Sequence, residues 1–105
     1  MIVIKTSSDN KQILEKIALK LLNQKVAGCV NLFPACISYF VWDNKINKSK
    51  ENLLFIKTIK KNEGKAYKII QNMHNYDTPE IITLTVENVE KHYKRWLMKE
   101  TKINA

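Results

Sequence analysis

The feature that most constrains this chain is a long stretch, residues 27–59, in which strand-forming residues are interrupted by one turn signal. Residues 27–44 are rich in β-branched and aromatic side chains, which favour strands. A turn is expected at Asp43 and Asn44, because these side chains bond to nearby backbone groups. Residues 52–59 predict the next strand, and residues 46–49 are a candidate extension of it. Together they predict a long β-hairpin, in which Pro34 marks a bulge or an edge.

Further strands and helices flank this hairpin. Residues 2–7 predict a first strand, and the alternation in residues 80–87 predicts a fourth. Apolar residues at i, i+4 spacing predict an amphipathic helix that follows the N-cap candidates at 8–10 and ends near residues 23–25. Similar stripes predict helices over residues 62–75 and 89–102, and Pro79 keeps the residue before it out of the helical region.

This order of elements, β-α-β-β-α-β-α, predicts an α+β fold: a ferredoxin-like split βαβ sandwich with an extra C-terminal helix. Right-handed crossovers place the two main helices on one face of a four-stranded sheet. The other face then needs a cover, which, with the long hairpin, indicates oligomerisation. Because the 105 residues show no break in composition, we expect residues 1–105 to form a single domain.

Charge and hydropathy limit the partners. The 18 basic and 10 acidic residues leave a net charge of +8, which suits nucleic acid, but no basic run exceeds two residues. The longest apolar runs are four residues, too short for a membrane span. The first of these stops at Lys5, far short of a signal-peptide core. We therefore expect a cytoplasmic protein with neither nucleic acid nor a membrane as partner.

The sequence contains no arrangement typical of an enzyme. Its serines lack a Gly-x-Ser-x-Gly context, and its two glycines stand apart, so no loop can cradle phosphate. An acylphosphatase-type enzyme on the same fold would need Gly and Arg in residues 5–9, where neither occurs. An RNA-binding domain of the RRM type would need more than one aromatic and a Gly in residues 53–59. We therefore predict a protein that is not an enzyme.

His74 is the candidate metal ligand. Asp77 and Glu80 follow within six residues as oxygen donors, and imidazole suits copper, zinc and nickel. A histidine that ends a helix also complements the helix dipole, so a capping role is the alternative. One histidine with two carboxylates is a weak metal site within a single chain. It becomes stronger only if symmetry adds ligands from another chain. Tyr39, Trp42 and Tyr76 lie outside the expected core, where they serve packing, a protomer contact or a ligand.

Four motifs along the chain carry a family resemblance. They are Cys29-Val30-Asn31-x-x-Pro34, Tyr39-x-x-Trp42-x-x-Lys45-Ile46, Glu51-x-x-Leu54-x-Ile56-Lys57-Thr58 and His74-x-Tyr76-x-x-Pro79-Glu80-Ile81. In this order the motifs resemble the CutA divalent-cation tolerance family over essentially the whole chain. The resemblance implies a ferredoxin-like protomer in a compact homotrimer, with hairpins of neighbours paired edge to edge. It also implies association with copper or another divalent cation, a cleft between protomers and no established catalysis.

Carried over residue by residue, the resemblance implies His74 and Glu80 as metal ligands. It implies ligand or cleft roles for Cys29, Tyr39, Trp42, Lys57 and Tyr76. The chain departs from the family's copper pattern at Lys5, where a cysteine is usual, and at Met73, where a second histidine is usual. A thioether still holds Cu(I), so Cu(II) binding is expected to weaken more than Cu(I) binding. A PII-like small-molecule signalling or protein-anchoring module is the alternative function, with an RNA-binding domain behind it.

Overall fold

A computed structural model describes residues 1–102 of the chain, as an α+β domain with a four-stranded sheet. Its elements are β1 (Ile2–Ser8), α1 (Lys11–Asn23), β2 (Cys29–Trp42), β3 (Lys45–Thr58), the 3₁₀ helix η1 (Lys60–Asn62), α2 (Glu63–Met73), β4 (Ile81–Thr85) and α3 (Lys91–Glu100). The predicted order of strands and helices is confirmed. The predicted domain of residues 1–105 includes 103–105, which lie outside the described residues.

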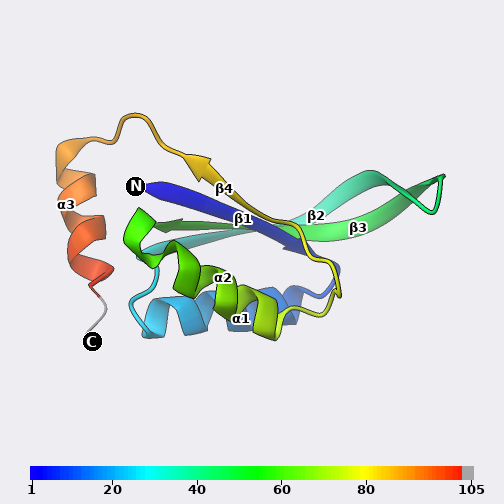
Figure 1. The fold of residues 1–105 in the computed structure, drawn as a ribbon, viewed down its shortest axis with the longest axis horizontal. Coiled ribbons are helices and arrows are strands. Elements are labelled where there is room, and N and C mark those ends of the chain that lie inside the picture. The colour runs from blue at the N-terminus through cyan, green and yellow to red at the C-terminus, as the bar shows by residue number, and fades with distance from the viewer. Residues whose placement is uncertain (103–105) are drawn as a thin grey trace.

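The four strands form one antiparallel sheet in the order β2-β3-β1-β4. Helices α1 and α2 lie against the same face of this sheet, and α3 stands at the end remote from the hairpin tip (Figure 1). The predicted α+β class, with both main helices on one face, is therefore confirmed. None of the described helices is long and apolar enough to cross a membrane.

The hydrophobic core lies between the sheet and these two helices. Alternate residues of β1 and β3 point toward the helices, as the period of two in a strand requires. The core side chains are Ile2, Ile4, Leu54 and Ile56 from the strands, Leu14, Ile17 and Leu21 from α1, and Ala66, Ile69 and Ile70 from α2. Burial of one large aliphatic side chain stabilises the fold by about 1.5–3 kcal/mol.

The hairpin is longer than the rest of the sheet. Strands β2 and β3 have 14 residues each, yet only residues 52–58 of β3 pair with β1. Residues 36–51, which we call the outer ribbon, therefore project beyond the sheet as a two-stranded ladder (Figure 1). The expected bulge is confirmed by the register shift between Phe33 and Cys36, where Ala35 has φ 62°. Asp43 and Asn44 form the turn with φ 51° and 59°, typical of a two-residue hairpin loop.

Some predicted boundaries differ from the structure. The two segments expected at residues 46–49 and 52–59 form one continuous strand, β3, because the whole segment pairs with β2. Helix α2 ends at Met73, two residues earlier than predicted, because His74 is extended with φ −69° and ψ 147°. This early end brings residues 74–76 back toward β1.

Helix α3 packs against the end of the sheet beside Gly28, which has no side chain. A Cβ at Gly28 would lie 2.7 Å from Leu97 Cδ1, so any larger residue there would force the Leu97 side chain to move. Leu97 is only 1% exposed, and Lys57 Nζ lies 5.9 Å from the Tyr93 ring centre. The N-cap of α3 is Glu90, whose carboxylate accepts from the backbone N–H groups of His92 and Tyr93. These hydrogen bonds lower the pKa of Glu90, and the one from Tyr93 has the largest effect.

Candidate functional site

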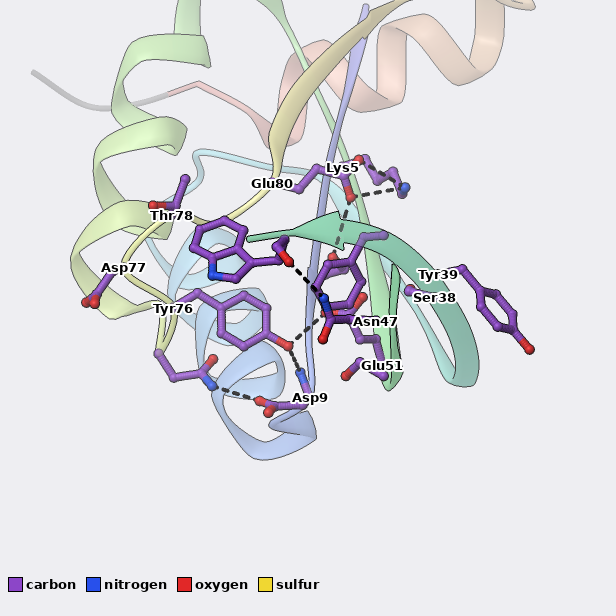
Figure 2. A pocket seen from close by; sticks show the side chains of 15 residues that line it. Lys5, Asp9, Ser38, Tyr39, Asn47, Glu51, Tyr76, Asp77, Thr78 and Glu80 are labelled. Carbon is purple, nitrogen blue, oxygen red and sulfur yellow. Dashed lines mark hydrogen bonds and ion pairs between the residues drawn. The ribbon is translucent and has the colours of Figure 1, made fainter. Parts of the chain in front are cut away.

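A cleft of about 1040 Å³ lies where the outer ribbon leaves the sheet (Figure 2). Its walls are the end of β1, the outer ribbon and the connection between α2 and β4. Its lining residues are Lys5, Ser7 and Asp9; Ser38, Tyr39, Phe40 and Trp42; Asn47, Ser49 and Glu51; and Asn75, Tyr76, Asp77, Thr78 and Glu80. The cleft therefore joins segments far apart in the sequence, with polar side chains on all three walls.

Tyr76 is the central hydrogen-bonding residue of this cleft. Its hydroxyl donates to Glu51 Oε2 at 2.8 Å and accepts from the Asp9 backbone N–H at 2.8 Å (Figure 2). Burial, followed by the hydrogen bond to Glu51, raises the pKa of Tyr76 to about 12. Glu51 is 8% exposed, so the phenol hydrogen bond serves a nearly buried carboxylate. Tyr76 thus ties the α2–β4 connection both to Asp9, which directly follows β1, and to the ribbon.

Asn75 strengthens the same connection. Its amide nitrogen donates to Asp9 Oδ1 at 2.8 Å, and its amide oxygen accepts from Ser8 Oγ at 2.5 Å. Sequence reasoning missed Asp9, Glu51 and Asn75 as site residues. For Glu51 there was a signal, because an isolated acid stands at the start of an apolar strand segment. For Asp9 and Asn75 the sequence carried no such signal, because only the fold brings these two residues together.

Both ring nitrogens of His74 are used within the chain. Nδ1 accepts from the Tyr76 backbone N–H at 3.0 Å, so Nε2 carries the hydrogen of the neutral ring. Nε2 then donates to the Ser7 carbonyl oxygen at 2.8 Å. In this arrangement neither nitrogen has a lone pair directed at a ligand. His74 positions the α2–β4 connection over β1.

The Glu80 carboxylate is already paired with a cation. Lys5 Nζ lies 3.2 Å from Oε1 and 3.3 Å from Oε2, and Ser7 Oγ donates to Oε1 at 3.4 Å. His74 and Glu80 thus both contact Ser7, one through the backbone and the other through the side chain. The fold brings the two predicted metal ligands to the same residue of β1, but each has protein partners.

The residues of one chain do not fit a copper site. Within residues 1–102 there is no group of three or more His, Cys, Asp or Glu side chains that could hold a metal ion. The softest nearby donor, Met73, packs against the hydrophobic core. Since His74 is saturated and Glu80 is paired with Lys5, no set of copper ligands converges here.

The other predicted cleft residues fall into two groups. Tyr39 and Trp42 line the cleft with Tyr76, although they are 68% and 59% exposed, and the Tyr39 ring points away from the cleft centre (Figure 2). Cys29 and Lys57 are cross-strand partners near α3, at the other end of the sheet. In a single chain they are outside this cleft. A cleft role for them through a neighbouring protomer stays a prediction.

The fold and the cleft together define a small α+β domain with a projecting hairpin and a polar cleft at its base. Comparison with known proteins identifies the family within that class. The family described as CutA1 divalent ion tolerance protein matches residues 1–100, and this chain belongs to it. The predicted family resemblance is confirmed.

Individual relatives agree with this assignment. The chain is 34% identical over 97 residues to the divalent-cation tolerance protein CutA of Thermotoga maritima, covering 92% of this chain and 95% of that protein. It is 31% identical over 101 residues to the chloroplastic CutA 1 of rice. That match covers 96% of this chain but only 57% of the length of the rice protein. The structure of the periplasmic CutA of Archaeoglobus fulgidus superposes with a TM-score of 0.92 at 30% identity, covering 97% and 100% of the two chains. Because these names give different compartments, the cytoplasmic location stays a prediction.

Proposed function

We propose that this chain acts in divalent-cation tolerance as a homotrimer that binds a small ligand in the cleft, which a neighbouring hairpin completes. The observation that carries the proposal is the exposed apolar surface of the outer ribbon. Tyr39, Val41, Trp42 and Ile46 are 68%, 70%, 59% and 80% exposed. Single exposed apolar residues are ordinary, but four on one short ribbon indicate an interaction surface.

The backbone of the ribbon supports the same conclusion. An isolated two-stranded ladder is only marginally stable in water. Strands β2 and β4 are the two edges of the sheet, so each has unpaired backbone groups within one chain. A closed ring of identical chains can satisfy both edges, and no free edge then remains for further growth. The strand order and the two helices on one face also support the ferredoxin-like assignment.

The cleft is suited to a small ligand. Its volume of about 1040 Å³ is at the upper end for small-molecule sites, and aromatic and polar side chains line it together. The proposal includes no catalysis. The pKa of Tyr76 is raised to about 12 and both His74 nitrogens are engaged, so at neutral pH the described site offers neither a phenolate nor a free imidazole. A bound copper ion is not part of the proposal, because the donors of one chain do not fit it.

The test removes one backbone donor from the free edge. In the alternating ladder, Trp42 and Lys45 flank the turn as a hydrogen-bonded pair, so the Val41 N–H points away from β3. Val41→Pro therefore removes a donor to a neighbouring chain, while Val41→Ala keeps that donor and is the matched control. We expect the wild type and Val41→Ala to have the mass of three chains by light scattering, and Val41→Pro to be monomeric.

The same variants test the role in cells. A strain without this gene should grow poorly in elevated Cu²⁺, Zn²⁺ or Co²⁺, and the wild type and Val41→Ala should restore growth while Val41→Pro does not. A wild-type protein that is monomeric at micromolar concentration would contradict the trimer. A trimer without any tolerance defect would instead favour PII-like small-molecule signalling.

A further inference from the structure

Lys5 occupies an unusual place for a lysine. It lies on β1 with Phe55 of β3 and Ile82 of β4 as cross-strand neighbours, so apolar side chains flank it on the same face of the sheet. Its side chain is only 25% exposed, against 40% for its partner Glu80. The Lys5 stem thus lies on an apolar surface while its ammonium reaches the carboxylate, as amphipathic side chains commonly do.

The ammonium stands where a bound cation would stand. Its distances of 3.2 and 3.3 Å to the two oxygens of Glu80 are nearly equal, so it bridges the carboxylate as a chelated cation does. Ser7 Oγ, at 3.4 Å from Oε1, is a third polar group at the same position. We propose that the Lys5 ammonium is the built-in cation of this cleft, so that Glu80 is neutralised without a metal ion and the cleft works metal-free.

A divalent ion that binds Glu80 has to compete with this ammonium for the two carboxylate oxygens. Because Lys5 is covalently attached to a central strand, it stays close to Glu80 and repels an incoming cation. The remaining donors do not compensate, since both nitrogens of His74 are engaged and the Met73 side chain packs on the core. The inference rests on the proposed function in one respect, because it concerns the same cleft. If it holds, a ligand binds in the cleft without a divalent metal ion.

Zinc calorimetry under reducing conditions tests this inference, because Zn²⁺ accepts thiolate and carboxylate ligands and is not redox active. The key variant is Lys5→Cys, which removes the ammonium and supplies a soft ligand beside Glu80. Lys5→Ser is its matched control, with a similar size but no thiolate, and Lys5→Arg keeps the positive charge. Cys29 and Cys36 are present in every protein tested, so their background is shared.

We expect the wild type and Lys5→Arg to show the same weak background, and Lys5→Cys to bind Zn²⁺ at least tenfold more tightly than Lys5→Ser. Adding Glu80→Gln to Lys5→Cys should remove that gain. The inference is overturned if Lys5→Cys shows no gain over the wild type. It is also overturned if Glu80→Gln alone weakens wild-type zinc binding tenfold, a test that leaves Lys5 intact. Light scattering on the same samples reports the trimer, so failure of the proposed assembly would be recognised separately.

Discussion

Strands β2 and β3 run through two regions of very different burial. Beside β1, where α1 and α2 cover the sheet, Leu54 and Ile56 are fully buried. In the outer ribbon the same strands leave Val41 and Ile46 70% and 80% exposed. Both regions carry aliphatic side chains in continuous β-structure, so strand formation alone does not determine burial.

The difference separates the apolar residues that stabilise the protomer from those that are available to the proposed assembly. The helix-backed region closes its own core, since Leu14, Ile17 and Leu21 of α1 are fully buried in it. The outer ribbon has no such cover in one chain, although it is as regular a ladder as the inner part. Its apolar residues are therefore expected to stabilise contacts between chains, and the two regions should respond differently to similar substitutions.

The largest difference is expected for truncation of one aliphatic side chain in each region. Leu54→Ala removes a fully buried side chain and should lower the free energy of unfolding by about 2–5 kcal/mol, because it leaves a cavity in the core. Ile46→Ala, at 80% exposure, should lower the intrinsic stability of the protomer by less than about 0.5 kcal/mol. Urea denaturation at several protein concentrations separates the two effects.

For Ile46→Ala, the loss should appear in the contribution of assembly, which acts on stability by mass action. Its unfolding midpoint should lie furthest below that of the wild type at high protein concentration and approach the wild-type midpoint on dilution. Leu54→Ala should shift the midpoint by a similar amount at every concentration. If both variants behave alike, the division between a self-sufficient region and an assembly-dependent region is wrong.

Tyr76 connects the two regions, so its removal should have the next largest effect. Tyr76→Phe deprives the nearly buried Glu51 of its phenol partner and should cost about 1–3 kcal/mol of unfolding free energy at neutral pH. Tyr39→Phe, in the exposed part of the ribbon, is the matched control and should change stability by less than about 0.5 kcal/mol.

The pKa of Tyr76 adds a pH dependence with a defined sign. The folded value of about 12 lies above the ordinary value of 10, so the unfolded chain loses this proton first as the pH rises. The contribution is fully present below pH 10 and is lost as the pH approaches 12. The wild type should therefore lose more stability than Tyr76→Phe over this range, by about 1–2 kcal/mol after allowance for partial exposure. Parallel alkaline titration curves for the two proteins would contradict this.

The fold was largely predictable from the sequence because hydrophobic periodicity determines its elements. The i, i+4 spacing around Ile17 and the alternation around Leu84 identified α1 and β4. The continuity of β3 was not predictable from its own residues. Lys45, Asn47 and Lys48 have weak strand propensity, and they are extended because they pair with Trp42, Phe40 and Tyr39 of β2.

The candidate site was predictable only as a region. The spacing of His74, Tyr76 and Glu80 indicated that these residues gather near the end of α2, and the structure places them over β1. The partners of His74 are a backbone carbonyl and a backbone N–H, which have no signature in a sequence. Lys5 and Glu80 are 75 residues apart, so their ion pair depends on the register between β1 and β4. A metal-ligand prediction from residue types could not anticipate either partner.

The smallest expected effect, of opposite sign, concerns the bulge where the outer ribbon begins. Ala35 is held at φ 62°, a left-handed conformation that costs a residue with a Cβ about 1 kcal/mol relative to glycine. Ala35→Gly relieves this strain and should raise the free energy of unfolding by about 0.5–1 kcal/mol, measured by urea denaturation at one protein concentration. Ala18→Gly, inside α1, is the matched control and should lower it by about 1 kcal/mol, because glycine disfavours a regular helix. If the same Ala→Gly substitution raises the free energy of unfolding at position 35 and lowers it at position 18, the bulge carries local strain while the backbone of α1 is relaxed. Destabilisation by both variants would mean that the ribbon tolerates its left-handed alanine without cost.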